Sequence, residues 1–319
     1  MTVSVVVPCY NARRWIRETL DSVFEQDVSP LEVILVDDGS TDGSAEFVRE
    51  RFPQVRVLTT QRAGPSRARN LGTCHSRGAF IQYIDADDLL APGKLAAQMA
   101  ALESSGADVA YGPWRELCAT QDGTFAPGRL VDRRLPGDAE LALLTEYWWP
   151  PAAYLFRRAI VERVGGWNEG LPVIQDARFA LDCALYGGKF VFCEGLAAYY
   201  RRHAKGSVST TDRQAFIRDC LRSTAEVEQW WRERGLLTPK RTDALVHAYG
   251  IAARASFGRD ATTFESAYAA LERLQPGYVP PFPRHLALAS RVLGYRRAEA
   301  AAVWYRRAKQ SLRLVGRPA

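Results

Sequence analysis

The sequence predicts an α/β fold, with a mostly parallel β-sheet in its first two thirds and helices after it. Between residues 3 and 112, short β-branched or apolar runs alternate with helical patterns. This alternation is typical of right-handed βαβ units, which build parallel sheets. From about Thr211 onward the pattern is almost wholly helical. We therefore expect an α/β domain at residues 1–210 and a helical C-terminal subdomain at residues 211–319.

The expected elements follow one another in a regular order. Runs of β-branched, aromatic and aliphatic residues predict strands at 3–8, 31–36, 55–59, 79–84, 109–112 and 152–156. Apolar residues at helical spacing predict helices at 12–26, 43–51, 65–76, 92–104 and 177–185. In the second part, the helical pattern covers 213–234, 239–257, 262–274 and 284–314, with Pro- and Gly-containing turns before the last stretch.

The composition is typical of a soluble globular protein, with 47% hydrophobic and 24% charged residues. The six cysteines include no Cys-x-x-Cys pair, which argues against a zinc site or a disulfide framework and suits a reducing compartment. The first residues show no signal-peptide pattern, and no apolar run reaches the ~18 residues of a membrane span. We therefore expect a cytoplasmic protein, or one bound at the inner face of the membrane.

The net charge of +6 is concentrated toward the carboxyl terminus. Nine Lys and Arg residues but one acid, Glu299, lie from Arg284 onward. This does not fit a nucleic-acid-binding domain with a basic face throughout. Toward the end of the chain, an apolar helical face stands opposite a basic one, with Ala301, Trp304, Tyr305, Ala308, Leu312 and Val315 against Arg306, Lys309, Arg313 and Arg317. Such a basic amphipathic helix lies either on an anionic membrane or against its own domain.

The most informative segment is acidic and ends the predicted strand 79–84: Tyr83-Ile84-Asp85-Ala86-Asp87-Asp88. Carboxylates this close repel one another strongly in a cleft of low dielectric constant. A divalent cation relieves the repulsion, and oxygen ligands suit Mg²⁺ or Mn²⁺. Because Mg²⁺ usually combines one or two carboxylates with phosphate oxygens, the cluster predicts a metal shared with a phosphorylated ligand. The alternative is a solvated loop whose last Asp caps the next helix.

Two further polar clusters follow predicted strands, at 8–11 and 37–42. Ligands of open α/β sheets bind beyond the carboxyl ends of the strands, so all three clusters are expected to share one crevice. Asp38 is the better ligand candidate within 37–42, whereas Ser40 and Asp42 suit helix capping. The chain has neither Gly-x-Gly-x-x-Gly nor Gly-Lys-Ser/Thr, so neither a dinucleotide-binding loop nor a P-loop is supported.

Four segments occur in order: Val-Val-Val-Pro-Cys-Tyr-Asn ending at Asn11, Leu-Val-Asp-Asp-Gly-Ser-Thr-Asp ending at Asp42, Gly-Pro-Ser-Arg-Ala-Arg-Asn-Leu-Gly ending at Gly72, and Tyr-Ile-Asp-Ala-Asp-Asp ending at Asp88. Together they resemble family 2 glycosyltransferases of the GT-A fold, a Rossmann-like fold of nucleotide-diphospho-sugar transferases. The resemblance covers residues 1–205. It implies a nucleoside-diphosphate sugar donor, usually a UDP sugar, a divalent metal (Mn²⁺ or Mg²⁺), and inversion at the anomeric carbon.

The resemblance also assigns roles by motif. The donor nucleotide-binding residues that it implies are Pro8, Tyr10, Asn11, Asp38, Arg67, Asp85 and Ala86. Among them, Asp38 would contact the base and Asp85 the ribose, and Arg69 is an alternative to Arg67. Asp87 would bind the metal that bridges the diphosphate.

A catalytic base is implied after a turn of the Gly-Gly-Phe type. Here Gly-Gly-Trp at 165–167 is such a turn, and Gln175 and Asp176 open the helix that follows. The family's usual pair is Glu-Asp, so Asp176 matches the base, while the departure at Gln175 puts a secondary acceptor contact in doubt. Inversion needs one carboxylate that removes the acceptor proton as the oxygen attacks. Glu169 is a weaker alternative base, and the helix dipole alone can explain an acid at position 176.

Segment 200–209 resembles the family's Arg-x-x-His-x-x-Ser segment, which implies that His203 meets the metal or the diphosphate. The alternative is a surface loop with one titrating histidine. Upstream, Trp148 and Trp149 suit either stacking on an acceptor sugar or packing in a core or lid cluster.

The sequence therefore predicts an inverting, metal-dependent glycosyltransferase of the hexosyltransferase type. Its acceptor would be a hydroxyl of a glycan or lipid-linked glycan, in the synthesis of cell-surface polysaccharide or glycoconjugate. The alternative is a non-catalytic GT-A-like protein that binds nucleotide sugars or glycans. Response regulators and phosphohydrolases also place acids at strand ends, but the Lys that they need at a later strand end is missing.

Overall fold

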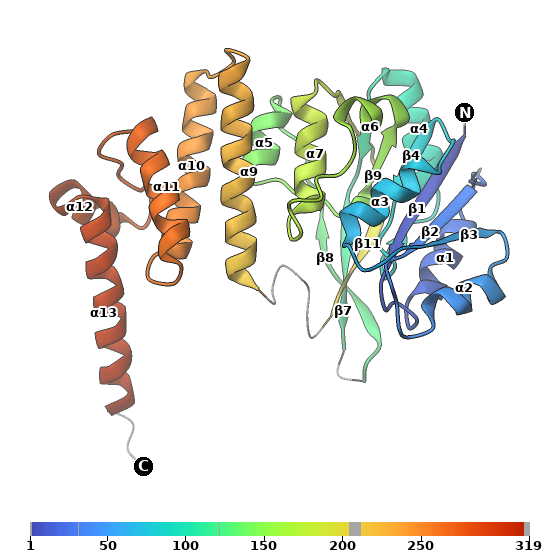
Figure 1. Cartoon of the computed structure of the whole chain (residues 1–319), viewed down its shortest axis with the longest axis horizontal. Helices are drawn as coiled ribbons and strands as arrows, with labels where there is room; N and C mark the ends of the chain where they lie inside the picture. Colours follow the sequence, from blue (N-terminus) through green and yellow to red (C-terminus); the bar gives the residue numbers. More distant parts are fainter. Residues whose placement is uncertain (1, 31, 121, 204–211, 316–319) are drawn as a thin grey trace. The chain divides into compact units, whose positions relative to one another are not determined.

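The structure is a computed structural model that describes residues 2–30, 32–120, 122–203 and 212–315, with side chains as far as Tyr305. The chain divides into two compact units, Met1–Thr211 (unit 1) and Asp212–Ala319 (unit 2), and each is described by itself (Figure 1).

Unit 1 is built on a seven-stranded sheet with the strand order β10-β6-β9-β4-β1-β2-β3. Its strands are β1 (Val3–Cys9), β2 (Glu32–Asp37), β3 (Val55–Thr59), β4 (Phe80–Tyr83), β6 (Val109–Tyr111), β9 (Tyr154–Arg157) and β10 (Phe190–Phe192). Strand β9 is antiparallel to β4 and β6, and the other neighbouring pairs are parallel. The predicted mostly parallel α/β sheet is therefore confirmed. Its central strands β1 and β2 are largely aliphatic because they are buried on both faces.

Helices connect the strands of this sheet. They are α1 (Ile16–Phe24), α2 (Ser44–Arg51), α3 (Pro65–Cys74), α4 (Lys94–Ser105), α5 (Ala139–Thr145), α6 (Arg158–Val164), α7 (Gln175–Leu185) and the short 3-10 helix η1 (Pro151–Ala153). Helix α3 lies against β1 and β2, with Ala68 in a buried cluster with Ile34 and Val36. Gly72 permits this close approach, because a Cβ there would lie 2.4 Å from Val6 Cγ1.

A second sheet of four strands, in the order β5-β11-β7-β8, was not predicted. Its strands are β5 (Leu89–Leu90), β7 (Trp114–Ala119), β8 (Phe125–Val131) and β11 (Ala198–Arg202). Most residues of β7 and β8 are half-buried or exposed, and β8 contains Pro127 and Gly128, so the hydrophobic pattern of a strand is weak. Strand β11 pairs antiparallel with β5, with Ala198 opposite Leu90. This pairing brings β11 beside the acidic segment that precedes β5.

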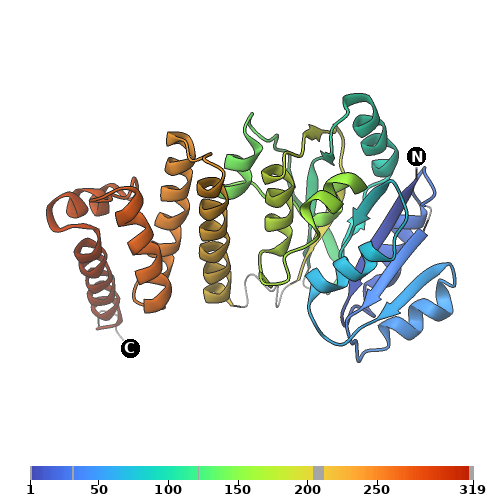
Figure 2. The same cartoon turned by 45° about the horizontal axis from the view of Figure 1, so that its top comes forward.

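The described residues of unit 2 form the helices α9 (Arg213–Glu233), α10 (Pro239–Ser256), α11 (Ala261–Leu274), α12 (Arg284–Leu293) and α13 (Tyr295–Val315). Helices α9, α10 and α11 pack against one another and lie side by side in Figure 2. The prediction of one continuous helix over 284–314 was wrong. Gly294 adopts φ 77° and ψ 152°, which lie outside the helical region, so α12 ends there and α13 starts anew.

The predicted basic face near the end of the chain falls on Arg306, Lys309, Arg313 and Arg317, whose side chains lie outside the described residues. Of the predicted apolar face, Ala301, Trp304 and Tyr305 are described, and all three are exposed. Within the described ranges, none of the helices is both long enough and apolar enough to span a bilayer.

Candidate active site

The loops that follow β1 and β2 meet at the carboxyl edge of the main sheet (Figure 1). Asn11 joins them: its backbone N–H donates to Ser40 Oγ (2.9 Å), and its Oδ1 accepts from the Thr41 N–H (2.8 Å). Its φ of 51° lies in the left-handed region, which Asn tolerates better than most residues. Asn11 therefore fixes the geometry of two of the three polar loops.

Asp38 is buried, and backbone groups occupy its carboxylate. Its Oδ1 accepts from the Ala63 N–H and its Oδ2 from the Gly64 N–H, each at 2.8 Å. These bonds fasten the end of β2 to the start of α3. Each oxygen keeps a second lone pair, so Asp38 can still accept one bond from a ligand at this edge.

The other predicted nucleotide-binding residues differ in accessibility. Pro8 is buried within β1, whereas the Tyr10 ring is 40% exposed and carries the Arg62 guanidinium 4.5 Å from its centroid. Arg67 is exposed on α3. Tyr10 is therefore accessible to a ligand, whereas Pro8 is enclosed in the sheet.

Arg69, and not Arg67, is the buried arginine of α3. Its side chain is 1% exposed, forms an ion pair with Asp85, and lies over the Trp167 ring at 4.3 Å. Its Nε and Nη1 have no hydrogen-bond partner among the described residues. Buried charged groups without partners are costly, so these N–H groups are donors that an anionic ligand or water would satisfy.

The structure places the three acids of the segment in three environments. Asp85 pairs with Arg69, and its side chain is 31% exposed. Asp87 Oδ2 lies 2.7 Å from Nε2 of His203. Asp88 is buried: its Oδ1 accepts from a backbone N–H of β11 (2.9 Å), and its Oδ2 has no partner among the described residues. Asp85 and Asp87 are therefore accessible to a ligand, and Asp88 is enclosed.

Electrostatics separates Asp88 further from its neighbours. Burial raises the pKa of the Asp88 carboxyl well above its ordinary value, and the charges of Asp87 and Asp85 raise it more. The intervening Ala86 is also buried, and its carbonyl accepts from the Thr19 hydroxyl (3.0 Å). Ala86 thus contributes a fixed backbone rather than a side chain.

Arg201 holds this segment in place, and nothing in the sequence pattern singled it out. Its side chain is 2% exposed. Nε donates to the Asp87 carbonyl (2.7 Å), Nη2 donates to Glu18 Oε2 (2.8 Å), and the guanidinium lies 4.6 Å from the Trp15 ring centroid. The available signal was its position two residues before His203. A short polar strand, however, does not reveal which of its arginines points inward.

Asp176 opens α7, as predicted, and is half-buried. Its Oδ2 accepts from the indole Nε1–H of Trp148 (2.7 Å), and its Oδ1 accepts from the Ala177 N–H (2.8 Å). Burial raises the pKa of the Asp176 carboxyl despite these hydrogen bonds. A carboxylate that is oriented and made more basic in this way suits proton abstraction.

Two further residues, Gln175 and Glu169, were weighed in the sequence beside Asp176. The amide of Gln175, oriented to satisfy its surroundings, donates to the carbonyls of Pro172 (2.7 Å) and Val173 (3.2 Å), so it belongs to the preceding loop. Glu169 is exposed, and its Oε1 accepts from Asn70 Nδ2 (2.9 Å).

The two tryptophans play different parts. Trp149 is buried in the core, with its ring 5.0 Å from that of Tyr111. Trp148 packs between the rings of Trp114 (5.3 Å) and Tyr200 (5.4 Å) and directs its N–H to Asp176.

The Tyr200 ring links the distant carboxylates. Burial raises the pKa of the Tyr200 hydroxyl, and the charges of Asp88, Asp176, Asp85 and Asp87 raise it further. Residues separated by about ninety positions in the chain therefore act on one side chain. The acidic segment and Asp176 therefore both lie near Tyr200.

The described residues offer a metal ion two ligands of suitable type, the Asp87 carboxylate and the His203 imidazole, from the ends of separate elements. In the described part of the chain, no group of three or more His, Cys, Asp or Glu side chains is arranged to hold a metal. Two protein ligands leave positions for phosphate oxygens and water. The Asp87 carboxylate fits the usual pattern for Mg²⁺, whereas an imidazole is more typical of transition metals.

Comparison with solved structures gives the fold. The crystal structure of residues 1–349 of TarS from S. aureus in complex with UDP-GlcNAc has a TM-score of 0.57 and 20% sequence identity, over 97% of this chain and 92% of that one. The same TarS fragment in complex with UDP gives a TM-score of 0.54 over the same shares. This level of identity establishes a shared fold.

Comparison with known sequences is more specific. EpsJ of Bacillus subtilis, described as an uncharacterized glycosyltransferase, is 32% identical over 190 residues, or 56% of this chain and 53% of EpsJ. The glycosyltransferase GlyG of Streptococcus pneumoniae is 34% identical over 127 residues, or 39% of this chain and 42% of GlyG. The chain thus spans about half or less of the length of these relatives. The family described as "Glycosyl transferase family 2" matches residues 4–160.

That matched range contains β1, β2, α3 and the acidic segment, which carry the four motifs. Residues 4–160 of this chain therefore belong to glycosyl transferase family 2.

Proposed function

We propose that this chain is an inverting, metal-dependent glycosyltransferase of the hexosyltransferase type. It moves a sugar from a nucleoside-diphosphate donor to a hydroxyl of a glycan or lipid-linked glycan acceptor. The observation that carries this proposal is a series of contacts between Asp176 and the acidic segment. Trp148 donates to Asp176 and packs against Tyr200 of β11, and His203, which follows β11, lies beside Asp87. A half-buried carboxylate of raised pKa and two accessible ones supply separate groups for proton removal and for donor binding.

The donor is proposed to bind along the edge formed by the loops after β1, β2 and β4. Tyr10 and Asn11 flank the nucleoside, the remaining lone pairs of Asp38 meet the base, and Asp85 meets the ribose. The unpartnered N–H groups of Arg69 are suited to the negative charge of the donor. A UDP sugar is the first donor to test, since TarS, which shares the fold, was crystallised with UDP and UDP-GlcNAc.

Asp87 and His203 would hold a divalent metal at the diphosphate. When bound, such an ion neutralises the charge that develops on the leaving diphosphate, so no protein acid is needed there. Arg201 positions Asp87 through its carbonyl and does not itself reach the ligand face. The metal pair therefore depends on β11 as well as on the acidic segment.

Asp176 acts as the base. Its carboxylate accepts the proton of the acceptor hydroxyl as the oxygen attacks the anomeric carbon from the side opposite the diphosphate, which inverts the configuration. The Trp148 N–H keeps Oδ2 oriented, and the Ala177 N–H keeps Oδ1 oriented. The Gln175 amide is bonded to carbonyls of the preceding loop. Asp176 is therefore the residue of this pair that we propose to meet the acceptor.

The decisive experiment is a donor screen with UDP, GDP and dTDP sugars, each with and without Mn²⁺. We expect metal-dependent donor hydrolysis and thermal stabilisation with one nucleotide class. Asp176→Asn should keep the stabilisation and lose the hydrolysis. Stabilisation without hydrolysis in the unmodified chain would favour the non-catalytic binding protein, and no stabilisation with any nucleotide would exclude both readings.

A further inference from the structure

Exposed apolar side chains gather in one part of unit 2. Among the described residues, ten large hydrophobic side chains are exposed, and six of them lie between positions 282 and 305: Phe282, Leu288, Val292, Leu293, Trp304 and Tyr305. Phe282 is 71% and Val292 is 84% exposed. Single exposed apolar residues are ordinary, but a cluster in sequence of this kind indicates an interaction surface where its members share one face of a helix.

Helix α12 presents the centre of this cluster. Leu286 and Ser290 are buried, and they lie four residues apart on one side of the helix. Leu288 and Val292, also four apart, lie on the other side, because consecutive residues are rotated by about 100° in an α-helix. The exposed side of α12 is therefore apolar along its middle.

Arginines flank this apolar stripe. Arg284 lies one turn before Leu288, Arg291 lies beside Val292, and both are exposed. Neither forms an ion pair with any residue that the structure describes. We call Arg284, Leu288, Arg291 and Val292 the α12 face.

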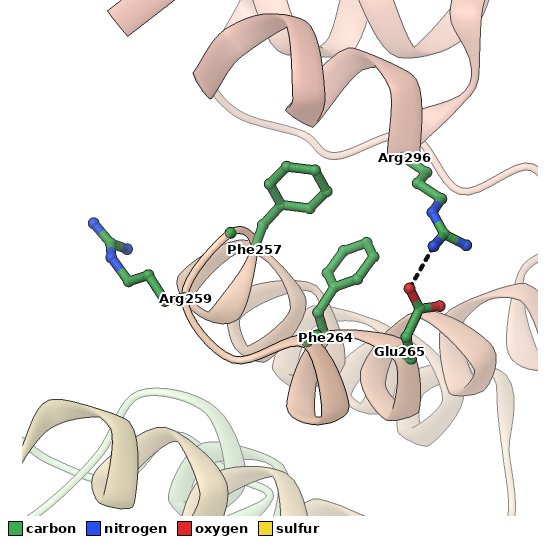
Figure 3. Close-up of a pocket in the computed structure, with 7 residues that line it drawn as sticks. Phe257, Arg259, Phe264, Glu265 and Arg296 are labelled. Carbon is green, nitrogen blue, oxygen red and sulfur yellow. Dashed lines mark hydrogen bonds and ion pairs between the residues drawn. The ribbon is translucent and has the colours of Figure 1, made fainter. Parts of the chain in front are cut away.

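A cavity in unit 2 contains an arginine that, unlike those of the α12 face, has an acidic partner. It has a volume of about 400 Å³, and Phe257 and Phe264 line it together with Arg296 (Figure 3). Arg296 is paired with Glu265 across the cavity, so its charge is already compensated. Among the residues that the structure describes, the two arginines of the α12 face have no such acidic partner, so they can meet an anionic surface.

We propose that the α12 face docks on the surface of an anionic lipid bilayer. Leu288 and Val292 enter the boundary between headgroups and acyl chains, and Arg284 and Arg291 meet the lipid phosphates, which is the arrangement of interfacial amphipathic helices. Two described aromatic residues of α13, Trp304 and Tyr305, are of the type that favours this boundary. The proposal does not rest on the proposed catalytic function.

The charge pattern favours a lipid surface over a second copy of the chain. Two α12 faces packed against each other would bring arginines against arginines. From Arg284 onward the chain has nine basic residues and one acid, so a second copy supplies little opposing charge. An anionic bilayer attracts every one of these groups, with a strength that falls as salt increases.

The test is co-sedimentation of the full chain with vesicles of phosphatidylcholine alone or of an equimolar mixture with phosphatidylglycerol. We expect binding to the mixed vesicles, weakened by salt, and little binding to the neutral ones. Leu288→Ser/Val292→Ser and Arg284→Gln/Arg291→Gln should each weaken binding by roughly tenfold. Because all four side chains are exposed, both variants should keep the circular dichroism spectrum and melting temperature of the unmodified chain.

Matched controls come from unit 2 itself. Leu236→Ser/Ile251→Ser removes two apolar side chains that are 41% and 49% exposed, and Arg213→Gln/Lys240→Gln removes two exposed charges elsewhere. Both should bind like the unmodified chain. Three outcomes would overturn the proposal: no binding to mixed vesicles, equal losses in the controls, or loss with Lys309→Gln/Arg313→Gln while the α12 variants bind normally. A dimer that the α12 variants abolish, with no vesicle binding, would assign the face to a second copy instead.

Discussion

The two acidic loops of unit 1 share a sequence pattern but differ in what satisfies their carboxylates. After β2, backbone N–H groups satisfy both oxygens of Asp38 and both oxygens of Asp42, whose partners are Arg13 and Ser44. After β4, Asp85 and Asp87 face side chains that a ligand can displace or share. A run of aspartates at a strand end therefore produces a scaffold in one loop and a candidate reactive surface in the other.

The largest effect on turnover should come from substitution of Asp176, the proposed base that acts together with Asp85 and Asp87. Asp176→Asn keeps the shape of the side chain but removes the base, so turnover should fall by roughly 10²–10⁴-fold while donor binding persists. Steady-state kinetics and a donor-dependent thermal shift measure the two properties separately. Glu169→Gln is the control and should change turnover little. If Glu169→Gln were the inactive variant, the base would be misassigned.

Asp87→Ala should have the next largest effect. Loss of a proposed metal ligand should weaken the response of donor binding to Mn²⁺ by about 100-fold or more, since even the outer partners of metal ligands are worth 10–100-fold. Titration of Mn²⁺ at fixed UDP, followed by thermal shift, measures this response. His203→Ala should act in the same direction. Metal binding that is unchanged in both variants would place the ion elsewhere.

Asp42→Ala tests the scaffold side of the comparison. It removes acceptors for the Arg13 and Ser44 N–H groups, at a cost of about 1–2 kcal/mol of folding free energy. Urea unfolding should show this loss, while the folded fraction should keep its turnover. Asp132→Ala, at an exposed position, is the matched control and should stay within about 0.5 kcal/mol of the unmodified chain. A large loss of turnover in Asp42→Ala would contradict the view that the loop after β2 has only a structural role.

The smallest effects concern pH. The raised pKa of Asp176 means that the base is protonated, and turnover falls, at a pH higher than the ~3.9 of a free Asp. The same shift means that ionised Asp176 costs stability at neutral pH, because the unfolded carboxyl ionises more readily. The melting temperature of the unmodified chain should therefore fall relative to that of Asp176→Asn as pH rises through the Asp176 pKa. A difference between the two melting temperatures that does not change with pH, or that changes in the opposite direction, would contradict this sign.

The sequence predicted the parallel sheet because the core strands and their helices have clear periodicities. It also placed polar residues at the carboxyl ends of β1, β2 and β4, since topology alone dictates that convergence. The sequence did not predict the pairing of β11 with β5, because β11 is short and polar and β5 has two residues. Arg201 was missed because it lies in this short polar strand, and the β7–β8 hairpin was missed because the hydrophobic pattern of its strands is weak.

Two further details depended on tertiary contacts. The bond from Trp148 to Asp176 joins residues twenty-eight positions apart, and an indole N–H carries no periodic signal that would predict it. At Gly294, the flanking helical pattern continues on both sides, so the sequence suggested one helix where the backbone forms two. In both cases the local pattern predicted the conformation of each segment correctly. It did not predict the contact or the break between the segments.

The contact between Asp87 and His203 spans 116 positions of the chain. A ribosome delivers the amino-terminal strands and the acidic segment long before it delivers β11, and domains begin to fold as they emerge. While these 116 residues are being added, the nascent sheet therefore carries its acidic loop without Arg201 to hold it or His203 to complete the pair. The proposed metal site is thus complete only after β11 has been made. The growing chain passes through the cell's pool of metal ions and nucleotides before it has the means to combine them.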